Sequence, residues 1–114
     1  MRNKALIGLT ELVKLVNGDK SKKVVARIDT GATQSSIDTS LATRLNLGPI
    51  ISSKIVRSTH GTTMRAVVKA SVVLAKRRIR AKFNVADRRH MRYKVLIGRN
   101  VLSGKGFLID PDKK

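Results

Sequence analysis

Apolar and polar residues alternate most regularly between Arg78 and Val85, where every second side chain is apolar. One face would carry Ile79, Ala81, Phe83 and Val85, and the other Arg78, Arg80, Lys82 and Asn84. A period of two is typical of a strand with one buried face and one face in water. The pattern therefore predicts a strand over 78–85 with a basic outer face.

Most other apolar runs are short and separated by turn-forming residues, which predicts an all-β fold. Asn17-Gly18 favours a tight hairpin, because both residue types tolerate positive backbone φ angles. The polar, glycine-containing segment 57–63 predicts the mobile tip of a second hairpin, which spans about 52–70. The further strands are predicted in two pieces within 4–16 and over 24–28, 50–56, 64–74, 95–97 and 107–110.

One or two short helices complete the predicted fold. Asp38 or Thr39 is placed to cap a helix that ends before Gly48-Pro49. Val101-Leu102 predicts a second helical turn, which Ser103-Gly104 ends.

Composition fits a single small domain over 1–114, with residues 111–114 as a flexible tail. The chain has 114 residues, 41% of them hydrophobic, which suffices for one modest core. It has no cysteine and two histidines, His60 and His90, so neither a metal nor another cofactor is expected. The first residues resemble neither a signal peptide nor a membrane span, so a cytoplasmic location and no membrane partner are expected.

The charge balance favours an acidic partner. Lysine and arginine number 25 against 7 acidic residues, a formal net charge of +18. An acidic peptide, nonspecific nucleic acid and an anionic ribosomal surface all remain open, as does a basic composition without a specific partner. The basic segments lack interleaved aromatic residues, which disfavours sequence-specific reading of single-stranded RNA.

Two separated motifs carry the candidate chemistry. Asp29-Thr30-Gly31-Ala32 follows one predicted strand, and Gly98-Arg99-Asn100 follows another. Together with the intervening hairpin and the chain length, they resemble the retropepsin-like aspartic proteases. Within that superfamily, the segments 6–13 and 26–37 are most similar to a prokaryotic group described as ATP-dependent zinc proteases, associated with RimK-type ATP-grasp ligases.

Two positions depart from these patterns. The prokaryotic group often has a histidine where this chain has Asp38, which argues against a zinc role. Retroviral enzymes carry an acidic residue where this chain has Thr33, so the usual carboxylate partner of Arg99 is absent there and Asp38 is the candidate instead.

The resemblance implies an acid protease barrel with one lobe per subunit, closed by homodimerisation. An aspartic protease needs two carboxylates facing one water, and the chain has one true Asp-Thr-Gly copy, so each subunit would lend one Asp29. Asp38-Thr39-Ser40 lacks the glycine and is interpreted as a helix cap. One Asp29 would take a proton from the attacking water, while its protonated partner would hydrogen-bond the oxyanion.

The resemblance also implies supporting residues around Asp29. The active-site loop would be supported by Thr30, Gly31, Ala32, Gly98, Arg99 and Asn100. A substrate-binding flap would present Ser58, Thr59, His60 and Gly61, with Gly61 letting the tip bend.

Two hypotheses follow. The first is a dimeric aspartic endopeptidase favouring acidic, Glu-rich segments, since the ligases associated with the group add glutamates to protein or peptide ends. The second is a catalytically weak retropepsin-like module that binds an acidic protein or RNA. No glycine-rich loop followed by Lys-Ser or Lys-Thr is present, so ATP binding of that kind is not expected.

Overall fold

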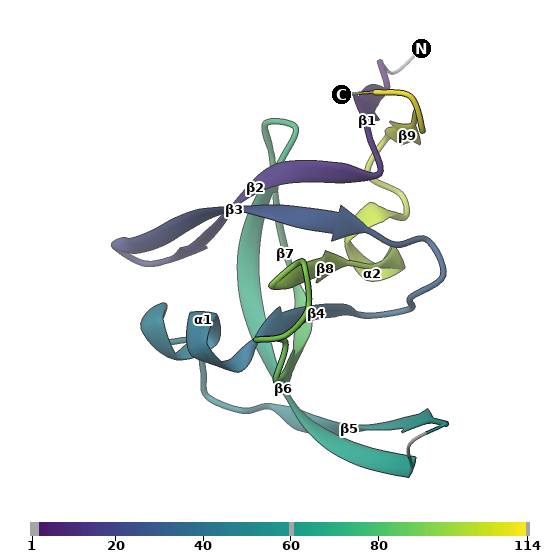
Figure 1. Ribbon diagram of the computed structural model, residues 1–114. Helices are drawn as coiled ribbons and strands as arrows, with labels where there is room; N and C mark the ends of the chain where they lie inside the picture. Colours follow the sequence, from purple (N-terminus) through teal and green to yellow (C-terminus); the bar gives the residue numbers. More distant parts are fainter. Residues whose placement is uncertain (1–2, 60, 114) are drawn as a thin grey trace.

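The computed structural model describes residues 3–59 and 61–113, in which nine strands and two short helices form (Figure 1). The strands are β1 (Ala5–Ile7), β2 (Thr10–Asn17), β3 (Lys20–Ile28), β4 (Ser35–Asp38), β5 (Ser52–Ser58), β6 (Gly61–Leu74), β7 (Arg77–Ala86), β8 (Val95–Ile97) and β9 (Phe107–Ile109). The helices are α1 (Thr39–Arg44) and α2 (Arg99–Leu102). The predicted all-β fold with two short helices is confirmed.

Six of the strands close into a barrel. Their order is β2-β3-β8-β4-β7-β6, and additional pairing between β6 and β2 completes the ring. The interior is mainly aliphatic, and Phe83 is the largest of its fully buried side chains. Closure leaves these strands few free edges and fixes the loops at their ends relative to one another.

The strand predicted from the regular alternation is confirmed as β7, but one of its residues lies in a different environment. Asn84 was expected on the solvent-exposed face, but it is only 4% exposed. Its Nδ2 donates to the Ser35 carbonyl at 3.1 Å and to Gln34 Oε1 at 3.2 Å. Asn84 is buried because strand β4, which the sequence pattern did not predict, lies beside it.

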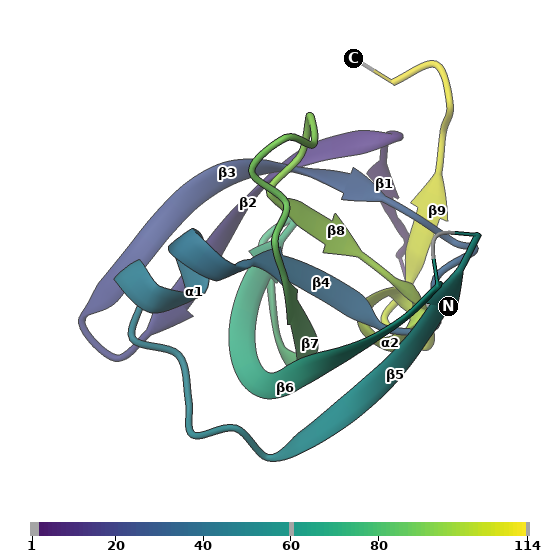
Figure 2. The same ribbon diagram turned by 60° about the horizontal axis from the view of Figure 1, so that its bottom comes forward.

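The predicted 52–70 hairpin forms from β5 and β6 and has a shorter tip than expected. The two strands pair as far as Ser58 opposite Gly61, and Thr59 lies in the turn, so most of 57–63 is strand. The hairpin leaves the barrel as an arm, and the end of β5 lies on the same side of the molecule as the loop after β3 (Figures 1 and 2).

The two ends of the chain form a separate two-stranded sheet. β1 pairs in parallel with β9, with Leu6 opposite Leu108. In the described part of the chain, neither α1, with six residues, nor α2, with four, has the length or hydropathy of a membrane span.

Candidate active site

Asp29 lies at the start of a tight loop that β3 delivers. Its backbone N–H donates to the Ile97 carbonyl at 2.8 Å, which fixes the loop to strand β8. Its side-chain Oδ1 accepts from the Gly31 N–H at 2.9 Å, and its carbonyl accepts from the Ala32 N–H at 3.3 Å. Asp29 is half-buried, while Thr30 and Gly31 are exposed. The carboxylate is thus oriented by the backbone and reachable from outside.

The second motif packs directly against this loop, as the resemblance implied. The Arg99 N–H donates to the Ala32 carbonyl at 2.8 Å, and the Asn100 N–H donates to the Thr33 carbonyl at 3.2 Å. A Cβ at Gly98 would lie 2.8 Å from the Gln34 carbonyl. Only a glycine allows the two backbones to approach this closely.

The Asn100 side chain links three segments beneath the loop. Its Oδ1 accepts from the backbone N–H of Ser35 at 3.0 Å and from the Ser35 hydroxyl at 2.8 Å. Its Nδ2 donates to the Lys82 carbonyl at 2.8 Å. The Ser35 Oγ in turn accepts from the Gly98 N–H at 2.9 Å. These bonds fix the position of Asp29 through its supporting residues.

Arg99 and Asp38 do not form the expected ion pair. Within residues 3–59 and 61–113, the ion pairs are Arg89–Asp87 and Lys113–Glu11. Asp38 instead caps α1, because its Oδ2 accepts from the Ser40 N–H at 3.1 Å. Its Oδ1 accepts from the Arg88 N–H at 2.7 Å. The helix-cap interpretation of Asp38-Thr39-Ser40 is therefore confirmed.

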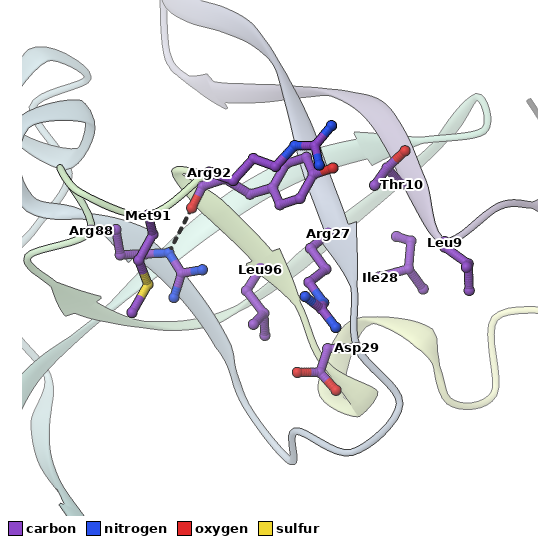
Figure 3. Close-up of a pocket in the computed structure, with 10 residues that line it drawn as sticks. Leu9, Thr10, Arg27, Ile28, Asp29, Arg88, Met91, Arg92 and Leu96 are labelled. Carbon is purple, nitrogen blue, oxygen red and sulfur yellow. Dashed lines mark hydrogen bonds between the residues drawn. The ribbon is translucent and has the colours of Figure 1, made fainter. Parts of the chain in front are cut away.

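A groove of about 740 Å³ opens beside Asp29 (Figure 3). In the figure, Leu96 lies between Arg88 and Arg27, and Asp29 lies next to Arg27. The lining residues are Leu9, Thr10, Arg27, Ile28, Asp29, Arg88, Met91, Arg92, Tyr93 and Leu96.

A second groove, of about 470 Å³, lies between the active-site loop and the β5–β6 arm. It shares Arg88 and Leu96 with the first groove, so the two adjoin. The Lys54 ammonium on β5 donates to Thr33 Oγ1 at 3.3 Å and bridges arm and loop. Of the predicted flap residues, Thr59 lies in the exposed turn and Gly61 starts β6. Ser58 ends β5, and His60 lies outside the described residues.

Positive charge dominates both grooves. Their cationic lining residues are Arg27, Lys54, Arg57, Arg65, Arg88 and Arg92. Among the described residues that line the two grooves, Asp29 is the one carboxylate. The charge balance of the sequence predicts an acidic partner but does not indicate which cations face it.

Arg88 is the most buried of these cations, with 8% exposure. Burial and the neighbouring Arg65 lower the pKa of its guanidinium, and the charge of Asp38 partly opposes this effect. No local pattern in the sequence marks this role, since Arg88 is one of several cations within residues 88–94. Of the described residues, no group of three or more His, Cys, Asp or Glu side chains is arranged to hold a metal ion.

These features match a known family. The model of the RimB-like family, described as retropepsin-like aspartic endopeptidase RimB, matches residues 38–114. The chain belongs to the RimB-like family. The matched residues include Gly98–Asn100 and Arg88, and Asp29 precedes them. The predicted resemblance to the RimK-associated retropepsin-like group is thereby confirmed.

Solved structures share the fold of this RimB-like chain. A protein of unknown function from Legionella pneumophila is 22% identical with a TM-score of 0.68, covering 96% of this chain and 95% of that one. The EIAV protease, complexed with the inhibitor HBY-793, is 22% identical with a TM-score of 0.69, covering 89% and 90%. The simian foamy virus protease is 19% identical with a TM-score of 0.56, covering 80% and 89%. No curated protein matches the chain.

These likenesses establish a retropepsin-like barrel as the fold of the chain. The predicted acid protease barrel is therefore confirmed.

Proposed function

We propose that this chain is a dimeric aspartic endopeptidase in which Asp29 from each of two subunits activates one water. The observation that carries the proposal is the geometry of Asp29. Its carboxylate is oriented by the Gly31 N–H, its loop is fixed to the Gly98 motif, and it lines a groove. Family and fold, which are those of retropepsin-like endopeptidases, support the same activity.

A second copy of the chain would complete the site. Each chain brings one Asp29, and the Thr30 and Gly31 tip of its loop is exposed. In the described part of the chain, β1 and β9 pair only with each other, so their outer edges are free for further strands. On this sheet the side chains of Leu6 and Leu108 are 55% and 50% exposed. A two-fold axis beside the loop would bury these surfaces and bring two carboxylates together.

In such a dimer the two Asp29 carboxylates share one proton, because two like charges about 3 Å apart cannot both persist. The ionised carboxylate takes a proton from the bridging water as the water attacks the peptide carbonyl. The protonated carboxylate hydrogen-bonds the developing oxyanion. Thr30 braces the paired loops, and the β5–β6 arm closes over the substrate and excludes water.

Acidic, Glu-rich segments are the proposed substrates. Six cations line the two grooves around one carboxylate, so a bound peptide lies in a positive field. Such a field raises the local concentration of anionic substrates and penalises cationic ones.

The test is cleavage of a Glu-rich peptide library, with products identified by mass spectrometry between about pH 4 and pH 7. We expect the wild-type protein to cleave the peptides and Asp29→Asn to lose cleavage by at least about a thousandfold, because the water loses its base. The matched control is Asp19→Asn, which alters an exposed turn carboxylate. Equal activity of the Asp29→Asn protein, or a stable monomer in sedimentation, would refute the proposed mechanism.

A second candidate, an anion-binding module with little activity, is favoured by charges on the outer barrel surface. Lys14 lies opposite Lys23, and Lys69 lies opposite Lys82, in directly paired strand positions. Like charges on directly opposite strand positions repel each other and destabilise the sheet. A bound polyanion would neutralise them. The library experiment separates the candidates, since a binding module retains the peptides without Asp29-dependent products.

A further inference from the structure

A row of directly paired residues forms the floor between Asp29 and Arg88. Leu96 lies opposite Arg27 on one neighbouring strand and opposite Ser36 on the other. Ser36 in turn lies opposite Asn84. Paired residues point to the same face of a sheet, so these four side chains share the groove side of the barrel.

Arg88 is held firmly above this floor. Its backbone N–H donates to Asp38 Oδ1 at 2.7 Å, and its carbonyl accepts from the Met91 N–H at 2.9 Å and from the Lys94 ammonium at 3.0 Å. Its Nε donates to the Tyr93 carbonyl at 3.0 Å, the dashed line in Figure 3. The side chain therefore has little freedom left to lose when a ligand binds.

The rest of the guanidinium has no partner. Among the described residues, neither terminal NH₂ group of Arg88 donates a hydrogen bond, and no carboxylate pairs with it. Asp38 directs its two oxygens to the backbone N–H groups of Arg88 and Ser40. A cation this buried is costly unless an anion pairs with it, and Arg65 and Arg27 add to the cost.

An unpaired hydroxyl lines the same groove. The Oγ of Ser36 is buried and has no hydrogen-bond partner, the one such side-chain atom in the described part of the chain. Ser36 is 3% exposed and lines the groove with Arg88 and Arg65. The same groove is thus lined by the Ser36 hydroxyl, which has no acceptor, and by the Arg88 guanidinium, which has no carboxylate partner.

We propose that Arg88 and Ser36 form a specificity pocket for the side-chain carboxylate of a glutamate in the bound peptide. The guanidinium takes the two carboxylate oxygens through its free NH₂ groups, the Ser36 hydroxyl donates a further bond, and Arg65 adds positive charge. The proposal rests on the proposed function, because it assigns a substrate side chain to the cleft of Asp29.

Peptide binding tests the pocket without cleavage. The probes are acetylated and amidated Glu and Gln peptides of equal length, titrated into the full-length Asp29→Asn protein. A Gln peptide with a free C-terminus tests whether a terminal carboxylate can replace the side chain. We expect the Glu peptide to bind about 10- to 100-fold more tightly than the Gln peptide, which is the range for hydrogen bonds to a charged group. The free C-terminus should not increase the affinity of the Gln peptide.

Variants in the Asp29→Asn protein identify the residues. Arg88→Met is expected to lose most of the preference for the Glu peptide without weakening binding of the Gln peptide. The control Arg44→Met makes the same charge change at an exposed helix residue and should retain the preference. Ser36→Ala is expected to weaken the Glu peptide about 3- to 10-fold without loss of folding, since it removes an unpaired hydroxyl. It therefore tests the pocket even if Arg88→Met does not fold.

The outcomes separate this inference from the proposed function. Equal binding of Glu and Gln peptides, or equal effects of Arg88→Met and Arg44→Met, would overturn the pocket even if the wild-type protein is a protease. If the Ser36→Ala variant binds the Glu peptide as tightly as the Asp29→Asn protein does, Ser36 is not part of the pocket. Arg88-dependent Glu binding in a wild-type protein that cleaves nothing would retain the pocket and refute the protease.

Discussion

At the scale of single residues, Gly98 is the position where the active-site loop has the least space. Its φ of −99° is open to any residue, so the constraint is steric. A Cβ would lie 2.8 Å from the Gln34 carbonyl carbon and oxygen and 2.9 Å from the Ala32 oxygen, all of them backbone atoms. Backbone cannot rotate away as a long side chain can, so the loop itself must move.

We therefore expect Gly98→Ala to lower the free energy of unfolding by about 1–3 kcal/mol, as measured by urea denaturation. Peptide cleavage should fall further than stability alone explains, because displacing the Ala32 carbonyl disturbs the loop that carries Asp29. Ser103→Ala, an exposed substitution at the other end of α2, is the control. A Gly98→Ala protein as stable and active as the Ser103→Ala protein would contradict this account.

Sequence could predict Asp29 and Gly98 because each lies in a short motif whose chemistry is local. Arg88 and Ser36 carry no such signal. Arg88 is one of several cations after β7, and its burial depends on the 87–94 loop folding back onto Asp38. Ser36 adjoins it through the pairing of β4 with β7 and β8. Groups brought together by non-local pairing cannot be read from the spacing of residues.

At the scale of elements, β4 shows why one strand was not predicted. Ser35 and Ser36 are polar, and the segment has no alternation, so it has the pattern of a loop. All four of its residues are buried, because β4 lies between β7 and β8 within the barrel. The Ser35 hydroxyl is satisfied by Asn100 and Gly98. Tertiary pairing thus determines the strand despite its composition.

The junction between β4 and α1 depends on Asp38. Its carboxylate accepts from the backbone N–H groups of Ser40 and Arg88, and its own N–H donates to the Lys94 carbonyl. We expect Asp38→Ala to lower the free energy of unfolding by about 2–4 kcal/mol, because it removes a helix cap and leaves a buried N–H unpaired. Asp38→Asn should cost less, since its amide retains one acceptor oxygen.

Thermal or urea denaturation measures these differences, with exposed Thr39→Ala as the matched control in the first turn of α1. An Asp38→Ala protein no less stable than Thr39→Ala would contradict the role of Asp38 as a buried cap. The measurement also separates stability from catalysis, because Asp38 takes no part in the proposed reaction.

At the scale of the whole molecule, one positive field acts on folding and on substrate binding in opposite directions. A net charge of +18 repels itself in the folded state, and Lys69 lies directly opposite Lys82. The same field attracts a Glu-rich peptide to a groove lined by cations. Salt screens both effects, because its screening length falls to about 3 Å at 1 M ionic strength.

We expect sodium chloride, raised from about 20 mM to 0.5 M, to increase Tm by roughly 2–5 °C while it weakens binding of a Glu-rich peptide at least tenfold. A Lys69→Gln, Lys82→Gln double variant should gain less Tm from salt, because its opposed charges are already removed. Its peptide binding should depend on salt as in the wild type, since neither lysine lines the grooves. A Tm that falls with salt would contradict the proposed self-repulsion in the folded state. Glu-peptide binding indifferent to salt would contradict the proposed electrostatic attraction of the substrate.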